Sequence, residues 1–306
     1  RVLGLTDVPL PDIKENPVDG IYIPGYEGTP TVDRILSTFD PDKPTVGIMF
    51  TSSNMVYHNT DHIDKAAEIL SSMGMNVYPI FYTALSYAVE GNPGAEGSIK
   101  KYFMKNGESL IDALILFTTF SVLGSSKTVK GVGPVDEENF FHTLTNVPVF
   151  VALGVSDKYD DFENDKIGLN KHDLSSGVAF SEIDGDIIGY PLSYTPRKSG
   201  MKKAVPIPDR ITRMGELVCN WARLRKKPVE DRKIAILMWQ SRPDSGRIGN
   251  AAGLDTPESI ANVLQKFDKA GYKVDNVPEN GRQLIEEILD GVTNNLDSMS
   301  SERLRE

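Results

Sequence analysis

The sequence predicts an α/β protein: a flavodoxin-like, doubly wound parallel sheet domain followed by the start of a second α/β domain. Short apolar runs alternate with helically spaced apolar stripes from Pro44 onward, which is the pattern of repeated β-α units. The links between these segments are short, so consecutive strands are expected to run parallel with helices on both faces of the sheet. A length of 306 residues suits about two domains.

The first domain is predicted to contain five strands, most of which are short, continuous apolar runs typical of buried strands. They are expected at residues 45–50, 76–82, 112–119 and 147–153, with a fifth around 178–181. The helices between them are expected at residues 63–73, 98–105 and 136–145. A last helix at 209–226 carries one apolar stripe, and Pro228 stops it.

A second series of β-α units starts at Lys233. Strands are expected at residues 234–239 and 272–277, and helices from Thr256, as the N-cap, and at 283–289. Two parallel strands cannot bury both faces of a sheet, so we expect this unit to be truncated. The predicted division is an extended lead-in or linker at residues 1–43, the flavodoxin-like domain at 44–230 and the second unit at 231–306.

The composition argues against several functional classes. Acidic residues (43) outnumber basic ones (33), and the net charge of −10 disfavours a nucleic-acid surface as the main function. No apolar run approaches the roughly 18 residues that a membrane helix needs. The single cysteine, Cys219, excludes an internal disulfide, and with no signal-like start we predict a cytoplasmic protein. Because the chain starts at Arg1, we expect it to be a piece of a longer protein.

The most informative stretch is the loop at residues 240–255, which follows a predicted strand and precedes a capped helix. Ligands of open α/β sheets bind at this end of a strand. Backbone amides beside glycines, together with a helix N-terminus, suit an anion. The loop offers three glycines and two arginines: Gly246, Gly249, Gly253, Arg242 and Arg247. A structured turn without a ligand is the alternative, because the spacing matches neither a dinucleotide fingerprint nor a P-loop.

Two further motifs are interpreted as structural. The segment 124–128 resembles the end of a P-loop but lacks its glycines, so ATP binding there is discounted. His58 and His62 are four residues apart, which on one helix is the spacing of a metal pair. A predicted helix cap separates them, so we favour the interpretation that they are loop and cap residues at the rim of a cleft rather than metal ligands.

Two charged groups have open interpretations. Glu182 and Asp184 form a carboxylate pair after the predicted fifth strand, which is weak support for acid–base chemistry. The basic residues at 197–203 suit either a polycarboxylate ligand or an exposed hairpin tip. No arrangement typical of a serine or cysteine nucleophile is suggested.

Several of these segments together resemble one family. The best matches are Trp221-Ala-Arg-Leu-Arg-Lys-Lys-Pro228, the strand from Lys233, and Gly246-Arg-Ile-Gly-Asn-Ala-Ala-Gly-Leu-Asp-Thr-Pro257. Weaker matches lie at residues 20–24, 59–64 and 181–185. In this order they are similar to the large subunit of ATP-dependent tetrapyrrole metal chelatases, of the cobaltochelatase CobN type and the magnesium chelatase H type.

The resemblance implies a role in inserting cobalt or magnesium into a tetrapyrrole, as in cobalamin biosynthesis. The large subunit would bind the macrocycle, while separate AAA+ partner subunits hydrolyse ATP. This segment would bind no cofactor and no resident metal, and it would be inactive alone because the catalytic residues would lie in a C-terminal part absent from this sequence. The candidate tetrapyrrole-binding residues are Asn59, Glu182, Arg242, Gly246, Arg247, Gly249 and Asn250.

The sequence departs from the family pattern at the end of the first predicted strand. Where the family reads Tyr-Arg-Ser-His, this chain has Thr51-Ser52-Ser53-Asn54, so an arginine and a histidine are missing. Two other functions also remain open, because a fold alone does not fix a function. One is a two-lobed α/β module that binds a small ligand, and the other is a docking scaffold for AAA+ subunits without chemistry of its own.

Overall fold

The computed structural model describes residues 16–26, 28–84, 90–118, 144–156, 159–166, 168–196, 203–239, 249 and 253–290. The chain forms two compact units, Arg1–Arg225 and Lys226–Glu306. The boundaries predicted after residues 43 and 230 remain predictions of the sequence. Within the described ranges, no helix is long and apolar enough to span a membrane.

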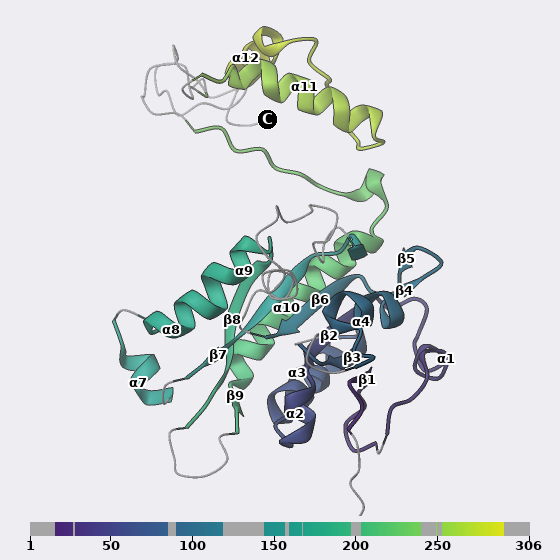
Figure 1. Ribbon diagram of the computed structural model, residues 1–306. Helices are drawn as coiled ribbons and strands as arrows, with labels where there is room; N and C mark the ends of the chain where they lie inside the picture. Colours follow the sequence, from purple (N-terminus) through teal and green to yellow (C-terminus); the bar gives the residue numbers. More distant parts are fainter. Residues whose placement is uncertain are drawn as a thin grey trace, which may run out of the picture. The chain divides into compact units, whose positions relative to one another are not determined.

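The first unit is built on a seven-stranded sheet with the order β1-β3-β2-β6-β7-β8-β9 (Figure 1). Its five central strands are parallel, and numbered along the chain they follow the order 2-1-3-4-5 of flavodoxin-like folds, which confirms the predicted fold class. The short β1 and β9 pair antiparallel at the two edges. The strands are β1 (Asp19–Ile21), β2 (Thr45–Thr51), β3 (Asn76–Tyr82), β6 (Ala113–Phe117), β7 (Val149–Val155), β8 (Ile187–Tyr194) and β9 (Val205–Pro206). A separate hairpin joins β4 (Met104–Lys105) and β5 (Glu108–Ser109).

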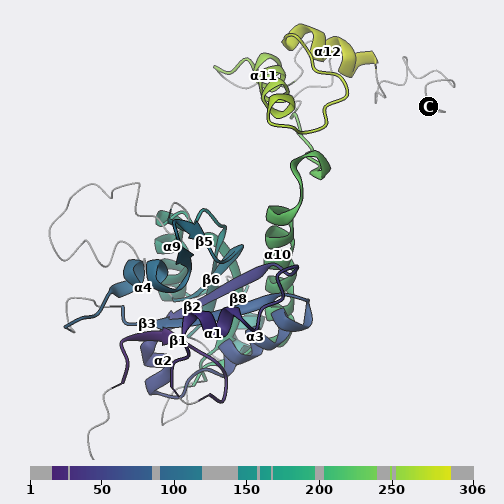
Figure 2. The ribbon, with the colours of Figure 1, turned by 90° about the vertical axis from the view of Figure 1, so that its right-hand side faces the viewer.

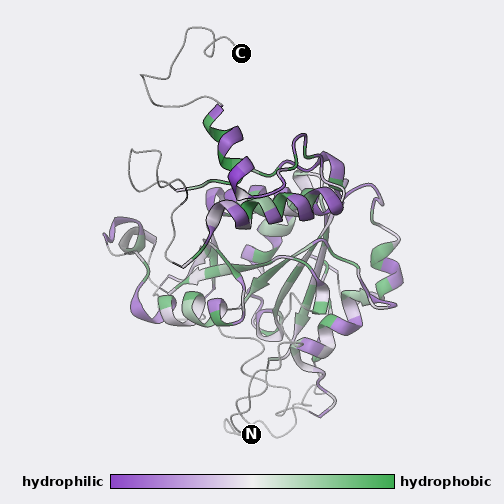
Figure 3. Ribbon diagram, turned by 90° about the horizontal axis from the view of Figure 1, so that it is seen from above, coloured by the Kyte–Doolittle hydropathy of each residue, from purple (hydrophilic) through white to green (hydrophobic). Residues whose placement is uncertain are grey.

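Helices cover both faces of this sheet, as Figure 2 shows for α4 and α10. One face packs against α3 (Asp61–Ser72) and α10 (Pro208–Lys226), and the other against α1 (Val32–Leu36) and α4 (Gly94–Tyr102). In Figure 3 the strands are green, and the helices are banded in green and purple because each buries only one side. The remaining helices of this unit are α2 (Ser52–Val56), α7 (Tyr159–Asn164), α8 (Lys171–Asp173), the π-helix η4 (Leu174–Ala179) and α9 (Phe180–Ile183).

Local chemistry explains where these elements begin and end. The strand β2 is an unbroken apolar run, which suits a strand buried on both faces. Helix α3 carries Asp61 and Asp64 in its first turn, where the helix dipole favours acidic groups. After this helix, Gly74 adopts a φ of +83°, a left-handed conformation that glycine tolerates best. The predictions for β2, β3, α3 and α10 are confirmed to within two residues.

The strand predicted at residues 178–181 is wrong. This segment is helical, within η4 and α9, and the fifth parallel strand is β8, several residues later. Asn170 explains the difference, because its side chain accepts a hydrogen bond from the backbone N–H of Asp173 (2.9 Å) and so starts a helix upstream. Gly177 then allows the helix to approach Leu153 of β7, since a Cβ there would lie 2.9 Å from that side chain.

The lead-in predicted as loop contains regular structure. β1 pairs with β3, and α1 follows it, so both belong to the first unit. The helix predicted at 98–105 is α4, which begins and ends earlier. Most of the helix predicted at 136–145 lies outside the described residues.

The second unit consists of a short 3₁₀ turn, η5 (Val229–Asp231), and two helices, α11 (Thr256–Lys269) and α12 (Gly281–Asp290). The strands predicted at 234–239 and 272–277 are wrong, since neither segment has strand pairing in the described part of the unit. A strand exists only beside a hydrogen-bonded neighbour, and apolar composition alone does not provide one. Asp255, rather than Thr256, is the N-cap of α11, with its carboxylate 3.1 Å from the N–H of Glu258.

Candidate functional site

A cavity of about 250 Å³ lies at the carboxyl ends of β6, β7 and β8. Open α/β sheets bind their ligands at this edge, so the cavity is the candidate site that the fold itself selects. The residues that line it are His62, Phe117, Ala152, Gly154, Val155, Ser156, His172, Asp173, Ser176, Ser193, Thr195 and Ala204.

Asp173 carries the negative charge of this cavity. Its side chain is only 7% exposed, and its Oδ2 accepts hydrogen bonds from the backbone N–H of Ser156 (2.8 Å), the Ser156 hydroxyl (3.0 Å) and the Asn170 amide (2.8 Å). Ser156 directly follows β7, and Asn170 caps α8, so the end of a strand and the start of a helix hold the carboxylate together. The exposed His172 ring also lies close, with its Nδ1 3.5 Å from Oδ1 of Asp173.

His62 lies on the other side of the cavity, in the first turn of α3. It is 5% exposed, and its ring packs edge-on against Phe117 with the centroids 5.4 Å apart. Burial lowers the pKa of His62 to about 4, although nearby Asp61 acts in the opposite direction. The ring is therefore neutral at physiological pH. Its Nδ1 is sealed from solvent without a hydrogen-bond partner among the described residues.

The two histidines singled out by their spacing do not form a metal pair. His58 is exposed, has a φ of +50° and precedes α3, as the capping interpretation predicted. In the part of the chain that the structure describes, no three His, Cys, Asp or Glu side chains are placed to hold a metal ion.

Two buried serines complete the polar lining, and sequence reasoning missed both. Ser176 donates to the carbonyl oxygen of His172 (2.8 Å), and Ser193 lies near the end of β8. Each is at most 5% exposed. For Ser193 the sequence signal was a hydroxyl near the carboxyl end of a parallel strand, but β8 was predicted too early in the sequence for that signal to be recognised. Ser176 lies in the helical segment η4 and carries no such signal.

Asn59 shapes the wall of the cavity. Its side-chain oxygen accepts from the backbone N–H of Ala204 (2.8 Å), a lining residue, and its carbonyl oxygen accepts from the Asn54 side chain (3.2 Å). Glu182, by contrast, is exposed on α9 and is not among the lining residues. The predicted tetrapyrrole contacts of both residues remain predictions.

The glycine-rich loop is described only in part. Arg242, Gly246, Arg247 and Asn250 lie outside the described residues. Gly249 is buried with a φ of +66°, and a Cβ there would lie 3.2 Å from the Thr256 side chain at the start of α11. The segments 124–128 and 197–202 also lie outside the described residues.

The departure from the resemblance noted at residues 51–54 lies at the end of β2, where short polar side chains form a small cluster. The Thr51 hydroxyl lies 2.7 Å from the Ser53 hydroxyl and 3.1 Å from the Asn54 side-chain oxygen. The Ser52 hydroxyl lies 2.9 Å from that of Thr83, which follows β3. This edge of the sheet therefore carries short neutral side chains that bond to one another.

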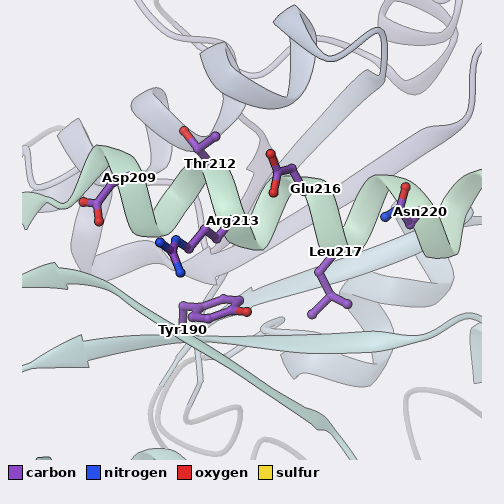
Figure 4. A pocket seen from close by; sticks show the side chains of 7 residues that line it. All are labelled: Tyr190, Asp209, Thr212, Arg213, Glu216, Leu217 and Asn220. Atoms are coloured by element: carbon purple, nitrogen blue, oxygen red, sulfur yellow. The ribbon is translucent and has the colours of Figure 1, made fainter.

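A second, larger hollow of about 820 Å³ lies between α10 and β8. Figure 4 shows Tyr190 of β8 below Arg213 and Leu217 of α10. The charged side chains that line it are of both signs and are all exposed to solvent. The carboxyl-edge cavity is therefore the better candidate site.

The fold and the cavity define an open α/β protein with a small polar site at the carboxyl edge of its sheet. Over residues 1–306 the chain matches the family described as CobN/Magnesium Chelatase, and it belongs to that family. It is 31% identical to an uncharacterised protein of Methanocaldococcus jannaschii, over 99% of this chain and 25% of that protein.

Named relatives agree with this assignment. The chain is 26% identical to the aerobic cobaltochelatase subunit CobN of Pseudomonas aeruginosa, over 88% of this chain and 21% of that one. It is 28% identical to the chloroplastic magnesium-chelatase subunit ChlH of Oryza sativa, over 82% and 17%. The catalytic subunit of cobaltochelatase from Mycobacterium tuberculosis shares the fold, with a TM-score of 0.66 at 22% identity over 90% of this chain and 22% of that one. The chain thus spans about a quarter or less of these relatives.

Proposed function

We propose that this chain is an N-terminal-to-middle segment of a cobaltochelatase-type large subunit that binds a tetrapyrrole for ATP-dependent insertion of cobalt or magnesium. The observation that carries the proposal is the family match along all 306 residues, together with similarity to both cobaltochelatase and magnesium-chelatase subunits. In this proposal AAA+ partner subunits hydrolyse ATP, the metal is a substrate, and the segment binds no cofactor of its own. Its proposed location is the cytoplasm.

The proposed contact with the macrocycle is the loop that begins at residue 240. Arg242 and Arg247 would pair with carboxylates on the rim of the macrocycle, while the amides of Gly246, Gly249 and Asn250 would donate further hydrogen bonds. Charge-assisted bonds of this kind are worth about 1.5–3 kcal/mol each.

Apolar contact would come from the segment that leads into this loop. Leu237 is 94% exposed and Trp239 81% exposed, which leaves two large apolar side chains in solvent beside the proposed contact. Apolar surface of this kind suits the face of a large conjugated ring.

The test is a fluorescence titration with a water-soluble carboxylated porphyrin. The chain has two tryptophans, so Trp221→Phe leaves Trp239 as the sole reporter, next to the proposed contact. We expect saturable quenching, and we expect Arg247→Ala to weaken the affinity about tenfold or more, as the loss of one charge-assisted bond requires. Arg282→Ala is the matched control, because Arg282 is exposed on α12 and pairs with Glu286.

Two results would contradict the proposal. Absence of saturable quenching would show that this segment does not hold the macrocycle. Quenching that Arg247→Ala and Arg282→Ala weaken equally would show that a diffuse positive charge, rather than the loop, is responsible.

A further inference from the structure

We propose that the carboxyl-edge cavity of the first unit binds a small primary ammonium compound that also carries a neutral hydrogen-bonding group, such as an amino alcohol. The ammonium group would bind Asp173, and the neutral group would form hydrogen bonds with His62 and Ser193. The proposed contacts all belong to the first unit, and the inference does not depend on tetrapyrrole binding.

The charge of the cavity favours a cation. Among the described residues that line the cavity, Asp173 is the carboxylate, and no lysine or arginine accompanies it. The three donors found for Asp173 among the described residues all bind Oδ2, and within these residues Oδ1 has only the exposed His172 ring, at 3.5 Å. A buried carboxylate with an uncommitted oxygen attracts a positively charged donor and repels an anion.

The hydroxyls beside Asp173 are acceptors. Ser156 uses its hydrogen on Asp173, and Ser176 uses its hydrogen on the carbonyl oxygen of His172. The Ser156 hydroxyl also accepts from the Asn170 amide (3.1 Å), so it offers the cavity one remaining lone pair, and Ser176 likewise offers only acceptor capacity. An ammonium group has three donors and no acceptor, so it complements a set of acceptors made of one carboxylate and two committed hydroxyls.

On the opposite wall, two polar side chains have no hydrogen-bond partner among the described residues. His62 and Ser193 are each 5% exposed and form no hydrogen bond from their side chains within the described ranges. The Nδ1 of His62 is buried without a partner among the described residues, and His62 lines the cavity. Leaving a buried polar group unpaired is unfavourable, and a neutral ligand group that both donates and accepts would satisfy the imidazole and the hydroxyl together.

The size of the cavity limits the ligand to a few carbon atoms. Its volume of about 250 Å³ lies below the range of about 300–1,000 Å³ typical of drug-sized sites. The remaining lining is apolar, and Phe117, Ala152 and Val155 would contact the carbon chain.

The experiment uses ethanolamine as the probe and the ring resonances of His62 as the signal. The chain has four histidines, so their NMR signals can be assigned by substitution, and the exposed His58 serves as an internal reference. At pH 7 a primary amine is protonated. We expect a saturable shift of the His62 signal with ethanolamine, a weaker one with ethylamine and none with glycolate.

Two variants test the assigned contacts. Asp173→Asn removes the charge while keeping an oxygen for the Ser156 donors, and we expect it to weaken ethanolamine binding at least tenfold. Ser193→Ala removes one hydroxyl from the opposite wall, and we expect a loss of about fivefold. Asp33→Asn is the control for charge, because Asp33 has a 90% exposed side chain on α1.

Each other outcome overturns the inference. No shift of His62 at high probe concentration would mean that the cavity takes no such ligand. Equal shifts with glycolate and ethanolamine would show that Asp173 does not select a cation. A folded Ser193→Ala variant with unchanged affinity would remove the opposite wall from the site.

Discussion

His62 and Asp186 are two buried titratable residues with opposite effects on stability. Burial lowers the pKa of His62 to about 4, whereas burial, helped by the nearby charge of Asp184, raises the pKa of Asp186 to about 7. The contribution of a neutral His62 to the free energy of unfolding is complete above pH 6.5 and is lost as the pH falls towards 4. The contribution of a protonated Asp186 to the free energy of unfolding is complete below pH 3.8 and is lost as the pH rises through 7. The two contributions oppose each other between about pH 4 and 6.5.

We predict that substitution separates these contributions. His62→Gln should reduce the stability gained between pH 4.5 and 6.5 by up to about 1.4 kcal/mol per pH unit, the limit for one proton. Asp186→Asn should stabilise the protein at pH 7.5, because it removes a buried charge whose Oδ1 has no partner among the described residues. Urea unfolding at several pH values measures both effects.

His58→Gln is the matched control for the first substitution, because His58 is an exposed loop residue and its loss should leave the pH profile of the wild type. If His62→Gln also retains that profile, His62 does not titrate in this window. If Asp186→Asn lowers stability at pH 7.5, the carboxylate has a partner that its surroundings in the described part of the chain do not show.

At the scale of elements, β8 shows what the sequence pattern predicts well and what it does not. Continuous apolar runs located β2, β3, β6 and β7, since a strand buried on both faces has to be apolar throughout. The strand β8 is half-buried along much of its length and contains a glycine and a proline, so it carries no such run. An apolar helical segment upstream was mistaken for it, because short apolar runs do not distinguish strands from helices.

Gly189 makes the packing of α10 on β8 possible. A Cβ at this position would lie 2.4 Å from the carbonyl oxygen of Val151 and 2.6 Å from the Met214 side chain of α10. We predict that Gly189→Ala destabilises the first unit by about 1–3 kcal/mol, because either the strand or the helix has to move. Chemical denaturation followed by circular dichroism measures the loss.

Gly154 on the neighbouring strand β7 provides the comparison for this substitution. A Cβ there would meet only the Ser193 hydroxyl, at 3.7 Å, which is an ordinary contact. Gly154→Ala should therefore cost less than about 1 kcal/mol. Equal losses for the two variants would show that strand flexibility, rather than the close approach of α10, decides the cost.

At the scale of the whole molecule, the sequence predicted the architecture of the first unit better than its site. The order of parallel strands follows from chirality and short connections, which leave few alternatives. The cavity depends on where the ends of β7 and β8, Asn170 and Ala204 meet in space, and no local pattern records such a meeting. The two strands expected in the second unit show the opposite case. Their apolar patterns are present in the sequence, but a strand also needs a neighbouring strand to pair with, and a local pattern does not supply one.

The two units differ most in the size of their own cores. In the described ranges, the second unit buries only two apolar side chains, Ala261 and Leu284, whereas the first buries two clusters that cover both faces of its sheet. Because buried apolar area is the main source of stability, we predict that α11 and α12 open at a cost of about 2 kcal/mol or less, and α3 and α10 at about 5 kcal/mol or more. Hydrogen exchange followed by mass spectrometry resolves the two regions.

Leu284→Ala should lower protection in α11 and α12 alone, and Val218→Ala, from the core of the first unit, should lower it in α3 and α10 alone. Amides of α11 as well protected as those of α10 would show that the second unit draws its stability from contacts other than its own core.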